Sequence, residues 1–173
     1  LNAGVSAWMM ISAALDLFMT LPGLALFYGG MARKKNVLSM MVQSFAVAAL
    51  VSVLWMAVGY SIAFTPGNGF LVGFDRVFFC FIMFLVEDGK LAIYPGLKTI
   101  PESVFFFFQM TFAIISSAII TGAFAERMKF SAIMVFIALW VLIVYAPTAH
   151  WVWGSDGWLA KDGVLDYAGG TVV

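Results

Sequence analysis

The stretch VLSMMVQSFAVAALVSVLWMAVGYSIAF, from Val37 to Phe64, contains no charged residue. A bilayer core about 30 Å thick needs about 20 mostly apolar residues to be crossed by a helix. Because lipid offers no hydrogen-bond partners, such a stretch must form a helix that satisfies its own backbone N–H and C=O groups. The sequence therefore predicts a membrane-spanning helix here.

Three further stretches have the same character and the required length. They run roughly over residues 5–32, 103–125 and 130–153, and the first is interrupted only by Asp16. The apolar segment 77–86 is too short to span and is expected to be an interfacial or packed loop. We therefore expect an all-α fold, a polytopic membrane helix bundle with four complete spans.

Composition agrees with a protein that lies in a lipid bilayer. Of the 173 residues, 64% are hydrophobic and 10% are charged, and the mean hydropathy is +1.03. Soluble domains carry about 45–50% apolar and about 25% charged residues. Nine basic and nine acidic residues leave no net charge, which argues against nucleic acid as a partner.

Few residues carry the chemistry that enzymes need. Cys80 is the only cysteine, and it excludes an internal disulfide or a multi-cysteine metal site. His150 is the only histidine, and no nucleophile–base pattern surrounds it. We expect no enzyme activity, no cofactor and no metal. For His150, a hydrogen-bonded packing role is favoured over proton relay.

Basic residues in the short loops orient the bundle. They lie in the turn after the first span and in the turn between the third and fourth spans: Arg33, Lys34, Lys35, Arg127 and Lys129. Since basic residues concentrate in short cytoplasmic loops, the N-terminus and residues 65–102, with Cys80, are expected outside. Trp151, Trp153 and Trp158 form an expected aromatic belt at that outer boundary.

The chain ends on Asp166 followed by YAGGTVV. Asp is a favoured helix N-cap, so we expect a fifth span to begin at about residue 166 and to be cut off after one turn. As a cap, the Asp166 carboxylate would accept hydrogen bonds from the backbone N–H groups of Ala168 or Gly169.

Two features inside the spans have more than one interpretation. Ser12, Asp16 and Thr20 follow one another at helical spacing of four residues and form a polar stripe. Asp16 is either a pore-lining acid or an interhelical or subunit contact. Phe108 and Phe112 also share a helix face, for packing or for a pore.

Seven segments, in order and covering nearly the whole chain outside residues 65–100, strongly resemble the Amt/Mep/Rh family of ammonium transporters. They are TLPGLALFYGG (20–30), KNVLS (35–39), FQMTFA (108–113), GAFAER (122–127), FSA (130–132), AHWVWG (149–154) and DYAGGTVV (166–173). The resemblance implies a homotrimer of eleven-span subunits, each with a pore built from two inverted five-helix repeats. This chain would supply the first repeat up to the start of its fifth helix.

The resemblance also implies roles for single residues. Phe112 and Trp153 would surround an ammonium cation recruited at the outer face, and Asp166 matches the acid that organises this site. Phe108 resembles half of an aromatic gate beside it. Two apolar residues match pore-lining positions: Leu24 and Val152.

The family's paired pore histidines have no match in this chain, and His150 is neither of them. Two departures concern helix packing: Asp16 replaces an expected aliphatic residue, and Ser116-Ser117 stands where relatives often have Thr-Pro.

The implied function is ammonium transport across the cell (inner or plasma) membrane for nitrogen uptake. The cation would be recruited, deprotonated and passed as ammonia through a hydrophobic pore, with a cytoplasmic PII-type protein as a regulatory partner. Two alternatives remain open. The same bundle would serve an ammonium sensor coupled to a cytoplasmic signalling module, or a packing subunit without a pore.

Overall fold

A computed structural model describes residues 1–70, 76–79, 93–94, 99–124 and 126–173. In these residues the secondary structure is helical, apart from one isolated antiparallel bridge between Ile93 and Pro101. Four helices are long and apolar enough to cross a membrane. The expected all-α bundle with four long apolar helices is therefore confirmed. Cys80 and residues 80–86 lie outside the described residues.

Three of the four long helices contain a wider, π-helical turn. In chain order the segments are α1 (Ala3–Phe18), a π turn (Met19–Leu24) and α2 (Ala25–Met31); α3 (Val37–Leu54), a π turn (Trp55–Gly59) and α4 (Tyr60–Phe64); α5 (Glu102–Thr121); and α6 (Phe130–Trp140), a π turn (Val141–Tyr145) and α7 (Ala146–Trp153). A short helix, α8 (Trp158–Lys161), follows.

The first π turn lies where the sequence contains Pro22. Proline has no N–H to donate and its ring clashes with the preceding turn, so the helix accommodates it by widening. The second π turn ends at Gly59, where a methyl group would lie 2.9 Å from Cε3 of Trp55. Glycine at this position therefore leaves room for the fully buried Trp55 ring.

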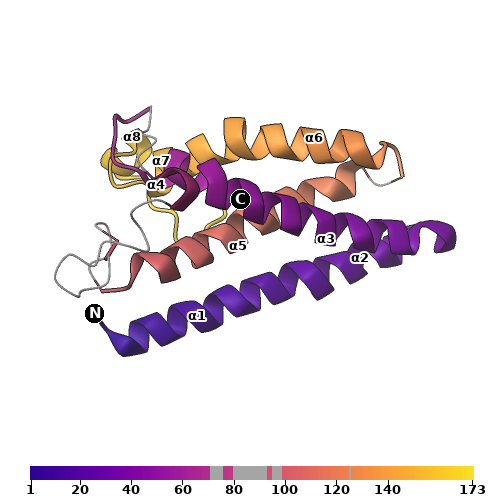
Figure 1. The fold of residues 1–173 in the computed structure, drawn as a ribbon, viewed down its shortest axis with the longest axis horizontal. Coiled ribbons are helices and arrows are strands. Elements are labelled where there is room, and N and C mark those ends of the chain that lie inside the picture. The colour runs from indigo at the N-terminus through magenta and orange to yellow at the C-terminus, as the bar shows by residue number, and fades with distance from the viewer. Residues whose placement is uncertain (71–75, 80–92, 95–98, 125) are drawn as a thin grey trace.

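The helix α5 lies in the interior of the bundle, where it contacts α1 and α3, while α3 also contacts α2 and α6 (Figure 1). Of the four long helices, α5 is the most buried and α1–α2 the least. The outward face of α1–α2 carries large apolar side chains: Trp8, Leu15, Phe18, Met19, Leu26 and Phe27. In a bilayer these side chains meet lipid or another protein surface.

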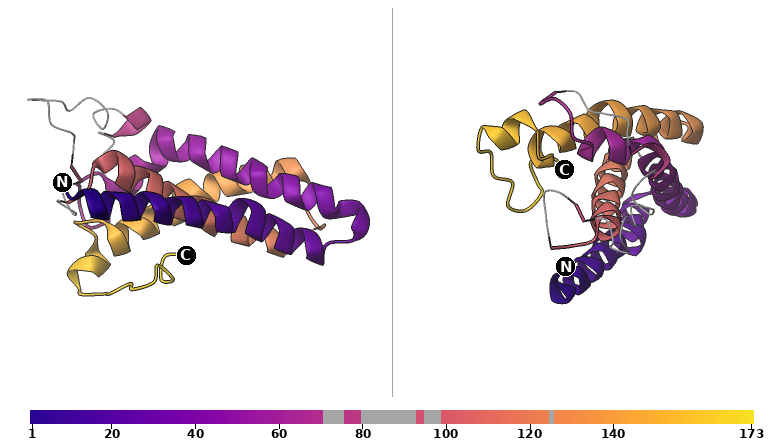
Figure 2. Two further views of the ribbon diagram at one scale, coloured as in Figure 1. Left: turned by 90° about the horizontal axis from the view of Figure 1, so that it is seen from below. Right: turned by 60° about the vertical axis from the view of Figure 1, so that its left-hand side comes forward.

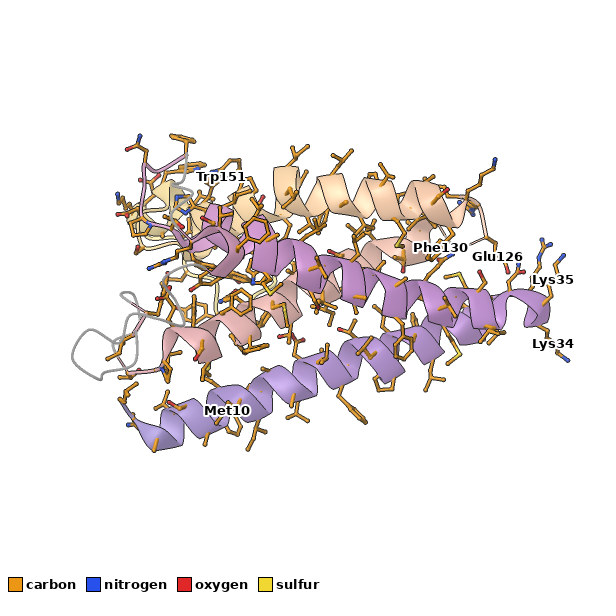
Figure 3. The ribbon with its side chains drawn as sticks, viewed as in Figure 1. Met10, Lys34, Lys35, Glu126, Phe130 and Trp151 are labelled. Atoms are coloured by element: carbon orange, nitrogen blue, oxygen red, sulfur yellow. The ribbon has the colours of Figure 1, made fainter. Side chains whose placement is uncertain are left out.

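The two ends of the bundle differ in chemistry. Figure 3 shows Lys34, Lys35 and Glu126 at one end, which we call the basic end, and Trp151 at the opposite end, which we call the tryptophan end. The N-terminus and the C-terminal segment both lie toward the tryptophan end (Figure 2). The two basic loops thus share one end, as the sequence indicates, while the membrane side that each end faces stays a prediction.

At the basic end, Glu126 joins the two short loops. Its Oε1 accepts hydrogen bonds from Arg33 N at 2.8 Å and from Asn36 Nδ2 at 2.9 Å. Its Oε2 lies 3.5 Å from Arg33 Nε. These hydrogen bonds hold the pKa of the Glu126 carboxyl below its usual value.

At the tryptophan end, a buried ion pair holds the turn at Val77–Phe79 against the helices. Arg76 Nη1 lies 3.1 Å from Glu102 Oε1 and donates to the Phe64 carbonyl at 2.7 Å. The Tyr60 hydroxyl donates to Glu102 Oε1 at 3.0 Å. Removing one partner would leave a buried charge unpaired, so this network stabilises the tryptophan end of the bundle.

Candidate functional site

Helix α5 presents four side chains to a cavity at the tryptophan end. Phe105, Phe108, Gln109 and Phe112 line this cavity, and their spacing (i, i+3, i+4, i+7) places them along one helix face. Phe105 and Gln109 are buried, while Phe108 and Phe112 are half-buried. The rings of Phe108 and Phe112 meet edge to face, with centroids 5.0 Å apart.

The last residue of α7, Trp153, supplies the facing aromatic ring. Its centroid lies 5.6 Å from that of Phe112, at an interplanar angle of 76°. The helix ends here because the next residue, Gly154, is extended and leads the chain away. Phe112 and Trp153, which the resemblance assigns to cation recruitment, are therefore in direct contact.

Asp166 holds the indole of Trp153 in place. Its Oδ2 accepts a hydrogen bond from Trp153 Nε1 at 3.0 Å, and its Oδ1 accepts one from the Thr171 backbone N–H at 3.2 Å. The expectation that Ala168 or Gly169 would donate to this carboxylate is wrong. The chain makes turns over 166–173, so the N–H group that reaches the carboxylate comes from five residues downstream.

Gly169 allows this turn to fit against the aromatic pair. Its φ is +78°, a left-handed conformation that glycine adopts without strain. A methyl group at this position would lie 3.0 Å from Cε1 of Phe112. Val173 N donates to the Gly169 carbonyl at 3.1 Å, a single helical hydrogen bond. The start of a fifth span at about residue 166 stays a prediction.

The cavity between these elements has a volume of about 720 Å³. Besides the residues above, it is lined by Tyr94, Gly154, Ser155, Ala160, Lys161, Tyr167 and Ala168. The Tyr94 ring is buried and stacks on Phe105 with centroids 4.0 Å apart. Burial raises the pKa of Tyr94 to about 12, so its phenol is neutral at physiological pH.

The charges around the cavity favour a cation. Asp166 contributes a carboxylate, and the ammonium group of Lys161 lies 3.5 Å from Asp156 Oδ1, which offsets its charge. Aromatic faces attract a cation within about 6 Å of the ring centroid by about 0.5–2 kcal/mol each. Rings from α5 and α7 next to one carboxylate therefore form an arrangement suited to a small monovalent cation.

The two residues expected to line a pore lie elsewhere. Leu24 ends the first π turn and packs partly buried against the core. Val152 is buried in the core. Neither is among the residues that line the cavity at the tryptophan end, and their role in a pore stays a prediction.

His150 is buried one turn before Gly154. Its Nδ1 lies 3.0 Å from the Ala63 carbonyl and its Nε2 lies 3.1 Å from the Asn68 carbonyl. It thus joins α7 to the end of α4 and the following loop. This geometry agrees with the packing role favoured by the sequence.

Asp16 is half-buried on α1, and its carboxylate interacts with Thr111 of α5. Thr20 donates to the backbone carbonyl of Asp16 at 3.3 Å rather than to its side chain. Oδ2 of Asp16 is buried and has no hydrogen-bond partner among the described residues. Both interpretations of Asp16 stay open.

Gln109, Phe105 and Tyr94 were not expected at this site. Gln109 and Phe105 follow from the period of α5, because they share the helix face of Phe108 and Phe112. Tyr94 has no such signal, since its segment precedes the helix. Within the described residues, no three His, Cys, Asp or Glu side chains gather into a metal-binding group.

Comparison with known proteins gives a consistent result. The family model described as Ammonium Transporter Family matches residues 7–173. The chain is 47% identical to the ammonium transporter of Bacillus subtilis (strain 168) over 173 residues, all of this chain and 41% of that protein. The chain thus spans less than half of the length of this relative.

Solved structures agree. The crystal structure of Saccharomyces cerevisiae Mep2 superposes with a TM-score of 0.80 at 36% identity, over 95% of this chain and 36% of that one. A structure described as a sensor Amt protein superposes with a TM-score of 0.83 at 29% identity, over 97% of this chain and 40% of that one. The family model names transporters, in agreement with the expectation that the chain is not an enzyme. The chain belongs to the ammonium transporter family.

Proposed function

We propose that the cavity at the tryptophan end recruits the ammonium cation in a protein that moves ammonium across a membrane. The observation that carries this proposal is the contact of Phe112 with Trp153, whose indole N–H is held by Asp166. Two ring faces and a fixed carboxylate supply attraction for a cation, and the one basic side chain that lines the cavity, Lys161, is paired with Asp156. The names of the relatives support ammonium as the substrate.

Each residue of this arrangement has a separate role in binding the cation. Ammonium is strongly hydrated, and its entry into an apolar pore without compensation is expensive. Phe112 and Trp153 attract the partly dehydrated cation, and Asp166 fixes the indole and adds negative charge. Phe108, in edge contact with Phe112, acts as one half of a gate.

Beyond the gate, an apolar path excludes the charged form, so the cation gives up a proton and ammonia continues. Leu24 and Val152 line part of that path. The paired pore histidines of the family have no match among the residues of this chain, which spans 41% of its Bacillus relative.

The proposed protein is a homotrimer in the cell (inner or plasma) membrane, with the tryptophan end and the N-terminus outside. The basic end then faces the cytoplasm, in accordance with the distribution of basic loop residues. A PII-type regulatory protein would dock from that side.

An ammonium sensor is the second candidate function, favoured by the similarity to the sensor Amt protein. A sensor and a transporter would share the recruitment site and differ in whether the bound cation is then carried across the membrane. Uptake of radiolabelled methylammonium by the full-length protein separates them, because a sensor without transport activity accumulates no label.

The test compares matched tryptophan variants of the full-length protein. Trp153→Leu removes one cation-binding ring, which we expect to raise the ammonium concentration for half-maximal uptake by about twofold to thirtyfold. Trp158→Leu removes a tryptophan of the same end that is stacked on Phe70, outside the cavity, and should leave this concentration unchanged. Equal effects of both variants would reduce Trp153 to a membrane-belt residue.

A further inference from the structure

One residue of the cavity does not fit the pattern of its helix face. Phe105, Phe108, Gln109 and Phe112 form a continuous stripe on α5, and Gln109 is the one polar side chain in it. Packing and cation–π attraction explain the three phenylalanines. Neither explains the amide of Gln109, because an apolar side chain would fill the same space.

The amide of Gln109 is buried without a partner for its oxygen. The residue is 7% exposed, and Oε1 has no hydrogen-bond partner in the described part of the chain. Buried polar side-chain atoms are generally hydrogen-bonded, because an unpaired acceptor loses its interaction with water and gains nothing in return. Because Gln109 also lines the cavity, its unpaired oxygen is an available acceptor for a ligand that donates a hydrogen bond.

The side-chain carboxylate that lines the cavity, that of Asp166, already accepts hydrogen bonds from the chain. Both oxygens of Asp166 accept N–H groups from within the chain, one from Trp153 and one from Thr171. The rings of Phe112 and Trp153 attract positive charge but offer no oxygen to replace a water molecule. Ammonium carries four N–H donors, and each donor that loses a water molecule on entering the cavity needs another acceptor.

We propose that Gln109 Oε1 accepts an N–H of the ammonium cation held by Phe112 and Trp153. This inference rests on the proposed function of the cavity and deepens it. The rings supply the attraction for charge, and the amide oxygen replaces part of the lost hydration. A hydrogen bond to a charged group is stronger than one between neutral groups.

The experiment changes Gln109 in opposite directions in the full-length protein. Gln109→Met keeps the length of the side chain and removes the acceptor, so the KM for ammonium uptake should rise about tenfold or more. Gln109→Glu keeps the acceptor and adds a negative charge, so the KM should fall severalfold at neutral pH. If Gln109 only packed against its neighbours, both substitutions would raise the KM.

Gln43 provides a matched control. It is 5% exposed on α3, and its Oε1 also has no partner among the described residues, but it does not line the cavity. Gln43→Met should leave the KM unchanged. Folded protein is quantified for every variant by size-exclusion chromatography, and KM values are compared only among folded variants.

An unchanged KM in Gln109→Met, or a raised KM in both Gln109 variants, would overturn the inference. If Gln109→Met does not fold, Gln109→Glu decides: a lower KM supports the inference, and an unchanged or higher KM overturns it. A KM raised by Trp153→Leu and Phe112→Ala but not by Gln109→Met would leave the proposed function standing without this role. If Trp153→Leu and Phe112→Ala also have no effect, the proposed function fails as well.

Discussion

The two ends of the bundle use their carboxylates in different ways. At the basic end, Glu126 accepts from Arg33 N and Asn36 Nδ2 and ties two loops together. At the tryptophan end, Asp166 orients an aromatic ring that lines a cavity, beside a buried Gln109 oxygen without a partner among the described residues. Both carboxylates accept hydrogen bonds from the chain itself, but the ring that Asp166 orients lines a cavity next to Gln109. This difference is the reason why we propose a binding site at the tryptophan end and a structural tie at the basic end.

The largest expected effect comes from Asp166→Asn. An asparagine has one acceptor oxygen, so its NH₂ group would face either the indole N–H of Trp153 or the N–H of Thr171. The negative charge is lost, together with one of the two hydrogen bonds that link the indole of Trp153 to the turn at Thr171. We expect the rate of ammonium uptake at low concentration to fall more than tenfold in the full-length protein, with its oligomeric state unchanged.

A double variant separates the two losses. Trp153→Phe removes the indole N–H and keeps an aromatic ring. The side-chain oxygen of an asparagine at position 166 then has a single N–H to accept, that of Thr171. If Asp166 matters only through orientation, Asp166→Asn should cost nothing further in the Trp153→Phe background. A further fall in uptake there would assign a role to the charge itself. Full activity of Asp166→Asn alone would remove Asp166 from the mechanism.

Gly169→Ala should have an intermediate effect. It places a side chain in a left-handed conformation, which costs about 1–2 kcal/mol, and a methyl group 3.0 Å from Phe112. The turn must shift and with it the aromatic pair. We expect a severalfold higher KM for uptake and a lower melting temperature. Gly163→Ala, at φ +85° with open space around it, is the control: it should lower the melting temperature without raising the KM.

The smallest effect on transport is expected from Glu126→Gln at the basic end. The variant should leave the KM for uptake unchanged and lower the melting temperature at neutral pH. Since the folded pKa of Glu126 is lowered, its stabilisation is complete above the unfolded value near 4.5 and is lost as the pH falls through the folded value. The difference in melting temperature between wild type and variant should therefore disappear in acid. A raised KM in Glu126→Gln would contradict the contrast between the two ends.

The sequence predicts the helices because each apolar run is long enough to cross a bilayer, and the period of α5 places Phe108 and Phe112 on one face. It does not predict which N–H group reaches Asp166, because the partner, Thr171, depends on the path of a turn with Gly169 in a left-handed conformation. The vacant hydrogen-bonding capacity of Gln109 is equally invisible in sequence, since it depends on what surrounds the side chain after packing. Local periodicity thus determines the helix faces, while contacts across the cavity depend on tertiary structure.

The most direct test is a crystal structure of the full-length protein with methylammonium, which is larger than water and distinguishable from it. We expect a difference-density peak, relative to crystals grown with sodium in place of methylammonium, within about 6 Å of the ring centroids of Phe112 and Trp153. The peak should be lost in Trp153→Leu and retained in Trp158→Leu. An empty cavity at saturating methylammonium, or an equal peak in Trp153→Leu, would contradict the assignment of the tryptophan end as the cation-binding site.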